Sequence, residues 1–119
     1  MFLKHHRNYL IMKQIEAIVQ SDVSKQVINE IRKAGVGGVT LIQSLGQGMG
    51  ERPEIGGRQI EFNSVDVILT VVHDSEVKSV VSAIMDIAHT GQKGDGKIFV
   101  SNVEESYDIS TKEKSTKLI

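Results

Sequence analysis

Hydrophobic and polar positions in the first third of the chain predict a strand, a helix and a second strand. Residues 13–20 and 38–43 are apolar and β-branched enough for strands. Between these two runs, apolar residues recur at the spacing of one helical face, at Val23, Val27, Ile31 and Ala34. We expect Ser21 or Asp22 to cap the start of this helix and Gly35 to end it.

The same order of elements returns in the second half of the chain. Residues 65–72 predict a third strand, Asp74 or Ser75 a helix cap, and residues 89–91 the end of a second helix. The apolar face of that helix consists of Val77, Val80, Val81, Ile84 and Ala88. Two βαβ units of similar length predict an α+β fold of the ferredoxin-like type, a double βαβ sandwich with both helices on one face of an antiparallel sheet. The signal for the other face is mixed, because the first strand places Gln14, Glu16 and Gln20 on it beside Ile18, whereas the third strand is apolar on both sides. Part of that face therefore needs cover, and self-association is the natural solution.

Residues 44–61 carry five glycines and the only proline of the chain, which predicts a long flexible loop between the second and third strands. A loop of this length is uncommon in so small a domain unless it has a role. Its charged and apolar residues suffice for contact with a partner: Arg52, Pro53, Glu54, Ile55 and Arg58. A solvated connection without a partner is an equal alternative.

Composition limits the classes of function. The 119 residues suit one small domain, and the net charge of −1 gives no strong electrostatic case for nucleic acid or an anionic membrane. The absence of cysteine excludes disulfides, thiol catalysis and cysteine metal sites, and it fits a cytoplasmic protein. Residues 1–11 hold no apolar run long enough for a secretory signal or a membrane span, so we interpret them as an extension that is expected to be disordered. Residues 111–119 are interpreted as a C-terminal tail.

The strongest chemical feature is a glycine-rich turn that ends in lysine and runs into an apolar strand, at residues 90–100. Glycine allows positive φ and close approach of a ligand to the backbone, and successive N–H groups can converge on an anion. Lys97 adds a compact positive charge. The turn therefore predicts a phosphate-binding site at Gly94, Gly96 and Lys97, against the alternative of an ordinary turn, in which Gly and Asp are also common.

The string Thr-Gly-x-x-Gly-Asp-Gly-Lys-Ile-Phe-Val at residues 90–100 resembles the signature before the last core strand of the PII signal-transduction family. Residues 12–19 resemble the opening strand of that family, and residues 34–40 resemble the end of its first helix. The resemblance covers residues 12–110, with the long loop at 44–61, and it is poor in the middle and in the tail. It implies a homotrimer in which an adenine nucleotide lies in clefts between subunits.

The resemblance also implies a set of nucleotide-binding positions. ATP, with Mg²⁺, or ADP would place its phosphates on the glycine turn and its base near the second and third strands. The positions that keep the family's residue type are Thr40, Gly46, Gly48, Val71, Gly94, Asp95, Gly96 and Lys97. Among them, Gly94, Gly96 and Lys97 carry the most weight, because their roles follow from chemistry alone.

The first departures from the family concern its charged groups. The family's arginine pair, which reaches phosphates across the subunit boundary, is replaced by Asp108 and Ser110, and a further arginine is replaced by Met49. Each charged hydrogen bond to a phosphate is worth about 1.5–3 kcal/mol, so losing two weakens binding roughly 10²- to 10⁴-fold unless other groups substitute. The candidates are Arg52, Arg58, Lys112 and Lys114. A diphosphate or monophosphate is therefore a serious candidate ligand besides ATP.

The usual sensing features of the family are also missing. Val65 stands where the family has a lysine for 2-oxoglutarate, and Gly50 stands at or near the position of its glutamine. The only tyrosines, Tyr9 and Tyr107, do not fall at the position that is uridylylated in some members. The resemblance thus implies a cytoplasmic regulator, not an enzyme and without membrane insertion, that controls a transporter or a metabolic enzyme through its long loop. A trimeric scaffold without nucleotide affinity and a small phosphate-ester enzyme are the alternatives.

Overall fold

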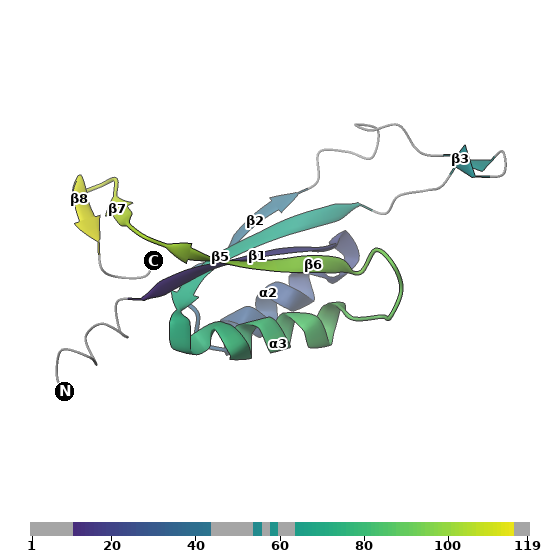
Figure 1. Cartoon of the computed structure of the whole chain (residues 1–119), viewed down its shortest axis with the longest axis horizontal. Coiled ribbons are helices and arrows are strands. Elements are labelled where there is room, and N and C mark those ends of the chain that lie inside the picture. The colour runs from purple at the N-terminus through teal and green to yellow at the C-terminus, as the bar shows by residue number, and fades with distance from the viewer. Residues whose placement is uncertain (1–10, 44–53, 56–57, 60–63, 116–119) are drawn as a thin grey trace.

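A four-stranded antiparallel sheet forms the centre of the protein (Figure 1). The computed structural model describes residues 11–43, 54–55, 58–59 and 64–115. Every neighbouring pair of strands in the sheet is antiparallel. The strands follow the order β2-β5-β1-β6, with β1 at Met12–Gln20, β2 at Thr40–Gln43, β5 at Val65–His73 and β6 at Gly96–Val103. The helix α2 (Ser24–Lys33) joins β1 to β2, and α3 (Val77–Ala88) joins β5 to β6.

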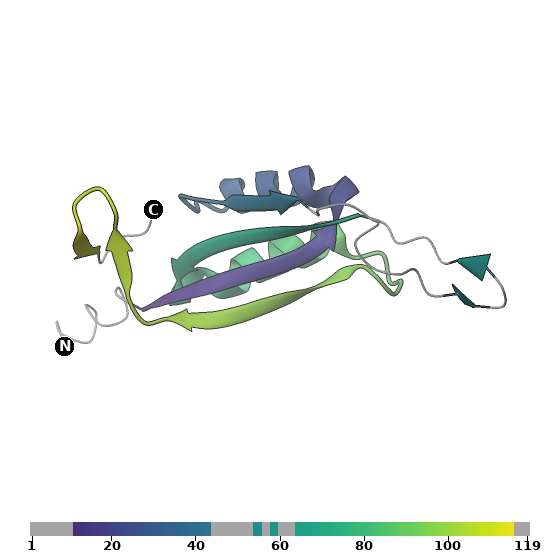
Figure 2. The ribbon, with the colours of Figure 1, turned by 90° about the horizontal axis from the view of Figure 1, so that it is seen from above.

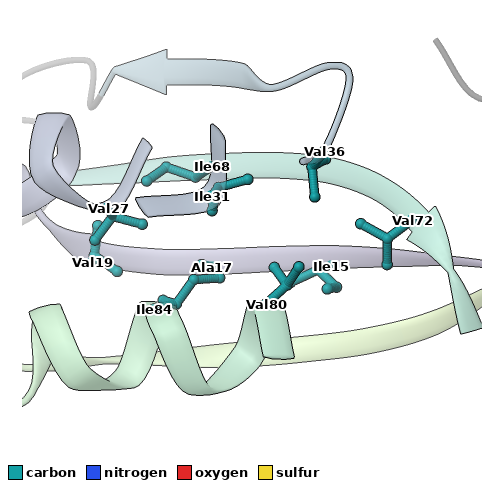
Figure 3. Packing of buried hydrophobic residues seen from close by; sticks show 10 residues of the cluster. All are labelled: Ile15, Ala17, Val19, Val27, Ile31, Val36, Ile68, Val72, Val80 and Ile84. Carbon is teal, nitrogen blue, oxygen red and sulfur yellow. The ribbon is translucent and has the colours of Figure 1, made fainter. Parts of the chain in front are cut away.

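Both helices lie on the same face of the sheet, and Figure 2 looks onto the opposite face. Side chains alternate between the two faces of a strand, so every second residue of β1 and β5 faces the helices. The core residues that are exposed by 1% or less are Ile15, Ala17 and Val19 from β1, Ile68 and Val72 from β5, Val27 and Ile31 from α2, and Val80 and Ile84 from α3 (Figure 3). This arrangement confirms the predicted ferredoxin-like double βαβ fold.

The face without helices is also apolar, but it is much less covered. Ile42 on β2 and Phe99 on β6, at the two edges of the sheet, are each 48% exposed. Between them, four residues of β1 and β5 are half-buried: Ile18, Val67, Leu69 and Val71. The strand register places all of these side chains on one face. An exposed apolar surface of this kind is a candidate site of interaction, although Glu16 lies on the same face between Phe99 and Leu69.

The first helix starts differently from the prediction. A one-turn 3₁₀ helix, η1 (Ser21–Val23), precedes α2, and no side chain caps α2. The prediction of a cap by Ser21 or Asp22 is therefore wrong. The Ser21 hydroxyl instead donates to Asp66 Oδ1 at 2.8 Å. Because Asp66 is only 5% exposed, its carboxylate needs hydrogen bonds from the protein, and this bond ties the start of the helix to β5.

The second helix starts in the same way. The 3₁₀ helix η2 (Asp74–Glu76) precedes α3, and no side chain caps α3, so the prediction of Asp74 or Ser75 as a cap is also wrong. The Glu76 carboxylate accepts the N–H of His73 at 3.0 Å. A capping box of His73 and Glu76 thus closes the start of η2, whereas the hydrogen bond of Ser21 ties the start of the first helix to β5.

Both helices end where the sequence predicts. Ala34 follows α2 as its cap residue, and the N–H of Gly35 donates to the Arg32 carbonyl at 3.0 Å. After α3, His89 is the cap residue, and the chain leaves the helix through Gly91. The two βαβ units thus end their helices at equivalent points.

Among the described residues, two short hairpins lie outside the four-stranded sheet. The first pairs β3 (Glu54–Ile55) with β4 (Arg58–Gln59), within the segment that the sequence predicts as a long loop. The second pairs β7 (Ser106–Asp108) with β8 (Glu113–Ser115), beyond the end of β6 (Figure 1). The domain boundary placed at residue 110 from the sequence falls in the turn of this second hairpin.

Candidate functional site

The predicted phosphate-binding segment forms a β-turn that leads directly into β6. The Asp95 N–H donates to the Gln92 carbonyl at 3.3 Å, which closes a turn from Gln92 through Lys93 and Gly94 to Asp95. Gly94 occupies the third position of this turn with φ +97°. A type II turn requires positive φ at that position, and only glycine adopts it at no steric cost.

Gly96 brings the turn into contact with β1. A β-carbon at this residue would lie 1.8 Å from the Ile18 carbonyl oxygen. Any side chain there would force β6 away from β1, although the two strands pair from Gly96 and Val19 onward. The two glycines thus serve different needs, because Gly94 supplies a conformation and Gly96 supplies space.

The Asp95 carboxylate stabilises the turn by accepting hydrogen bonds from the residues that precede it. It accepts the Thr90 N–H at 2.7 Å, the Gly91 N–H at 2.9 Å and the Thr90 hydroxyl. These hydrogen bonds, led by that of the Thr90 hydroxyl, hold the pKa of Asp95 below its usual value. His89 Nδ1 lies 3.9 Å from Asp95 Oδ2 and acts in the same direction. Asp95, predicted among the nucleotide contacts, therefore uses its carboxylate to shape the turn.

Two backbone donors of the turn remain available to a ligand. The Gln92 N–H donates to Thr90 Oγ1 at 3.3 Å. Within the described residues, no acceptor lies in hydrogen-bond range of the N–H groups of Lys93 and Gly94. Lys97 follows on β6 with an exposed side chain. Two backbone donors and the ammonium group of a lysine three residues after Gly94 can together bind an anion such as a phosphate.

The turn lies at the same end of the sheet as the two ends of the long segment 44–63. Gln20, the last residue of β1, donates from Nε2 to the Gly94 carbonyl. The next residue, Ser21, donates its N–H to the Ser64 carbonyl at 2.9 Å. Because Ser64 directly precedes β5, the glycine turn and the point where the segment rejoins the sheet share one junction.

The other predicted contacts on the sheet are spread over the face without helices. By strand register, Thr40 at the start of β2, Val71 on β5 and Lys97 on β6 share this face. Two strands separate β2 from β6, so Thr40 and Lys97 lie at least about 14 Å apart at the usual strand spacing. One copy of the chain therefore does not bring these two residues together.

Several predicted residues belong to the long segment. Within its described hairpin, Glu54 and Ile55 form β3 and Arg58 begins β4, and the backbones of Ile55 and Arg58 are paired. The rest lie outside the described residues: Gly46, Gly48, Arg52 and Pro53. The proposed contact of this segment with a partner thus stays a prediction.

A cleft of about 630 Å³ lies between α3 and the edge strand β6, on the helix side of the sheet. Its apolar wall includes Met85 of α3 and Val100 of β6, which are 51% and 45% exposed. Asp95 and Gly96 of the glycine turn line it as well. The sequence did not predict this cleft, because the pattern of apolar residues does not indicate that β6 is an edge strand whose outer side stays uncovered.

The lysines of the C-terminal hairpin lie far from the turn of their own chain. Lys114 Nζ lies 3.2 Å from Glu105 Oε2, and hydrogen bonds from Lys114 and Tyr107 hold the pKa of Glu105 below its usual value. Lys112 lies in the turn of the hairpin. The eight residues of β6, about 26 Å of extended strand, separate the glycine turn from this hairpin. Either lysine could substitute for a missing arginine only at the turn of another copy.

The described residues contain neither a metal cluster nor a membrane-spanning helix. No group of three or more His, Asp or Glu residues among them is placed to hold a metal ion. Within the same ranges no helix is long and apolar enough to cross a membrane, since α3 has 12 residues and a bilayer requires about 20.

Comparison with known proteins identifies the family. The family model of nitrogen regulatory protein P-II matches residues 12–113. The nitrogen fixation nifHD region GlnB-like protein 1 of Methanothermococcus thermolithotrophicus is 36% identical over 102 residues, which cover 86% of this chain and 97% of that protein. The nitrogen regulatory protein P-II 2 of Methanothermobacter thermautotrophicus is 36% identical over 114 residues, which cover 92% of this chain and 99% of that protein. The crystal structure of Arabidopsis thaliana PII bound to citrate has a TM-score of 0.66 at 30% identity, and it covers 90% of this chain and 88% of the Arabidopsis chain.

The chain therefore belongs to the nitrogen regulatory protein P-II family, as the resemblance at residues 12–19 and 90–100 predicted. Proteins of this family are signalling regulators rather than enzymes. The likeness to the Arabidopsis protein also confirms the ferredoxin-like fold.

Proposed function

We propose that the protein binds an adenine nucleotide, ATP or ADP, in clefts between the subunits of a homotrimer. The phosphates lie on the turn of residues 92–97, with Lys97 as their charged partner. The bound nucleotide sets the conformation of the segment 44–61, through which the protein regulates a transporter or a metabolic enzyme. In this account the protein reports the adenylate energy state of the cell.

The geometry of the glycine turn is the observation that carries this proposal. Asp95 engages the N–H groups of Thr90 and Gly91, and the N–H groups of Lys93 and Gly94 remain available. The turn is thus already shaped before a ligand arrives. Binding a phosphate there orders little additional chain, which keeps the entropic cost of binding low.

The strand register favours a site that two subunits share. Thr40 and Lys97 lie at opposite edges of the same sheet face. Copies arranged side by side around an axis would place β2 of one subunit next to β6 of its neighbour, where the two residues approach each other. The same assembly would cover the exposed apolar side chains of Ile42 and Phe99.

The expected ligand chemistry is simpler than in many members of the family. Val65 carries no charge with which to hold 2-oxoglutarate, and no tyrosine lies within residues 44–61. We therefore expect neither the usual 2-oxoglutarate sensing nor tyrosine uridylylation. Any Mg²⁺ that arrives with ATP would be bound by its phosphate oxygens, because the described residues offer no metal cluster of their own.

Isothermal titration with ATP and ADP, with and without Mg²⁺ and 2-oxoglutarate, tests the proposal. Lys97→Ala removes a charged hydrogen bond worth about 1.5–3 kcal/mol, so the dissociation constant should rise roughly 10- to 150-fold. Lys78→Ala is the matched control, because Lys78 is an exposed lysine near the start of α3, away from the turn. It should leave the affinity unchanged.

Each other outcome of this titration would contradict a different part of the proposal. No binding by the wild-type protein would remove nucleotide sensing and favour the trimeric scaffold. Equal affinity in the wild type and in Lys97→Ala would contradict the placement of the phosphates on the turn. Turnover of the bound nucleotide would instead favour a phosphate-ester enzyme.

A further inference from the structure

Gln20, the last residue of β1, contacts the glycine turn, and Ser21, the first residue of η1, contacts the point where the long segment ends. The Gln20 amide donates from Nε2 to the Gly94 carbonyl, and a β-carbon on Gly94 would lie only 3.4 Å from that nitrogen. The Ser21 N–H donates to the Ser64 carbonyl at 2.9 Å. A single peptide bond, between Gln20 and Ser21, therefore links the turn to the point where the segment 44–63 rejoins the sheet.

The carbonyl oxygen of the Gln20 amide accepts no hydrogen bond from the described residues. Its Oε1 atom is buried and has no hydrogen-bond partner among the described residues. A buried acceptor without a partner costs at least as much free energy as one ordinary hydrogen bond contributes. The net contribution of the Gln20 amide to the stability of the fold is thus expected to be zero or unfavourable, and its contact with Gly94 needs another explanation.

We propose that Gln20 is a positioning residue that couples the glycine turn to the root of the segment 44–63. An anion on the turn fixes the backbone at Gly94, and the Gly94 carbonyl in turn fixes the Gln20 amide. The Gln20–Ser21 peptide transmits this restraint to the hydrogen bond between Ser21 and Ser64. The inference rests on the proposed nucleotide site and adds the route by which that site acts on the segment.

Amide hydrogen exchange, measured residue by residue by NMR on the full chain with and without saturating ADP, tests the coupling. In the wild type, ADP should slow exchange of the Ser21 N–H roughly 5-fold or more. Gln20→Met keeps the length of the side chain but removes the donor. In this variant ADP should still bind, while the Ser21 N–H exchanges at one rate with and without the ligand.

A control variant and the unfolding temperature separate positioning from stability. Gln14→Met lies on the same strand and the same face as Gln20 and should keep the wild-type response. The unfolding midpoint of Gln20→Met should equal or exceed that of the wild type, because a buried acceptor without a partner has been removed. A wild-type effect of ADP on Ser21 in Gln20→Met would overturn the proposal, as would an equal loss of that effect in Gln14→Met.

Exchange rates measured without ligand distinguish a failure of the coupling from a failure of the proposed function. If the wild type binds no nucleotide, the proposed function fails, but the hydrogen bond of Gln20 can still be tested. Without ligand, Gln20→Met should then speed exchange at both the Asp95 N–H in the turn and the Ser21 N–H at the segment root. Faster exchange at Asp95 with an unchanged rate at Ser21, or no change at either, would overturn the coupling itself.

Discussion

The two faces of the four-stranded sheet use similar apolar residues for different purposes. On the helix-covered face, Ile15 and Ile68 are 0% and 1% exposed, because two helices of the same chain close over them. On the opposite face, Ile42 and Phe99 are each 48% exposed, and no described segment of the chain covers them. One face therefore completes the fold of the subunit, while the other is left exposed and is the face on which we propose that subunits meet.

The candidate site shows the same division. The glycine turn is complete within one chain. The Asp95 carboxylate accepts hydrogen bonds from the backbone of the turn, and Gly96, which has no side chain, allows close contact with β1. The second part of the proposed site, at Thr40, lies across two intervening strands. Folding alone prepares the glycine turn, whereas the rest of the proposed site would depend on assembly.

The largest effect is expected from opening the helix-covered face. Ile15→Ala leaves a cavity at a fully buried position and should lower the free energy of unfolding by about 2–5 kcal/mol. Urea unfolding at several protein concentrations measures this loss, which should be the same at each concentration. The control Ile109→Ala, at a residue that is 94% exposed, should change stability by less than about 0.5 kcal/mol. Equal small losses in the two variants would show that this face is not the core.

A smaller effect on the subunit, but a clear one on assembly, is expected from Phe99→Glu. A buried Phe contributes about 1.5–3 kcal/mol to an interface, and a carboxylate on the apolar face adds a desolvation penalty. Sedimentation equilibrium should show dissociation into folded subunits. Met85→Glu is the matched control, because Met85 is 51% exposed but lies on the helix side of the sheet. Trimers that survive Phe99→Glu, or that dissociate equally in Met85→Glu, would contradict the assignment of the faces.

The smallest effect is expected on the pKa of Asp95. Its pKa lies below the usual value of 3.8, so its contribution to the turn is present above that pH and is lost as the pH falls through the lowered pKa. Thr90→Ala removes the largest cause of this shift and should return the pKa toward its usual value. An NMR titration of the side-chain carboxyl carbon measures the change, with Ser82→Ala on α3 as a control. An unchanged pKa in Thr90→Ala would show that the hydroxyl does not hold the carboxylate.

Sequence patterns predicted those parts of the molecule in which local chemistry decides the structure. The alternation of apolar residues gave the strands, the glycines gave the helix ends, and the spacing of Gly94 and Gly96 located the turn. In each case the signal lies within a few neighbouring residues. A backbone that needs positive φ or close approach to another strand has few residue types to choose from.

Long-range contacts account for what the sequence did not predict. Ser21 was expected to cap a helix, but it bonds to Asp66, which lies 45 residues further along the chain. Gln20 was not recognised as a partner of Gly94, because a polar residue at the end of a strand has no distinctive pattern. The hydrogen bonds from Thr90 to Asp95, five residues apart, were also not predicted, because they depend on how the turn folds back. The contact of Asp95 with a ligand stays a prediction. The cleft beside β6 likewise depends on which strand lies at the edge of the sheet.

The central claim is that two subunits share each nucleotide site, and an experiment that mixes subunits tests it most directly. Lys97→Glu disables the turn half of the site and Thr40→Trp blocks the β2 half, so neither variant alone should bind ADP. When the two are mixed in equal amounts, unfolded and refolded together, about a quarter of the sites in a ring should combine two intact halves. Calorimetry should therefore recover about a quarter of the wild-type binding sites. No recovery, with wild-type protein active after the same refolding, would contradict the account, because a site within one subunit always carries one of the two substitutions.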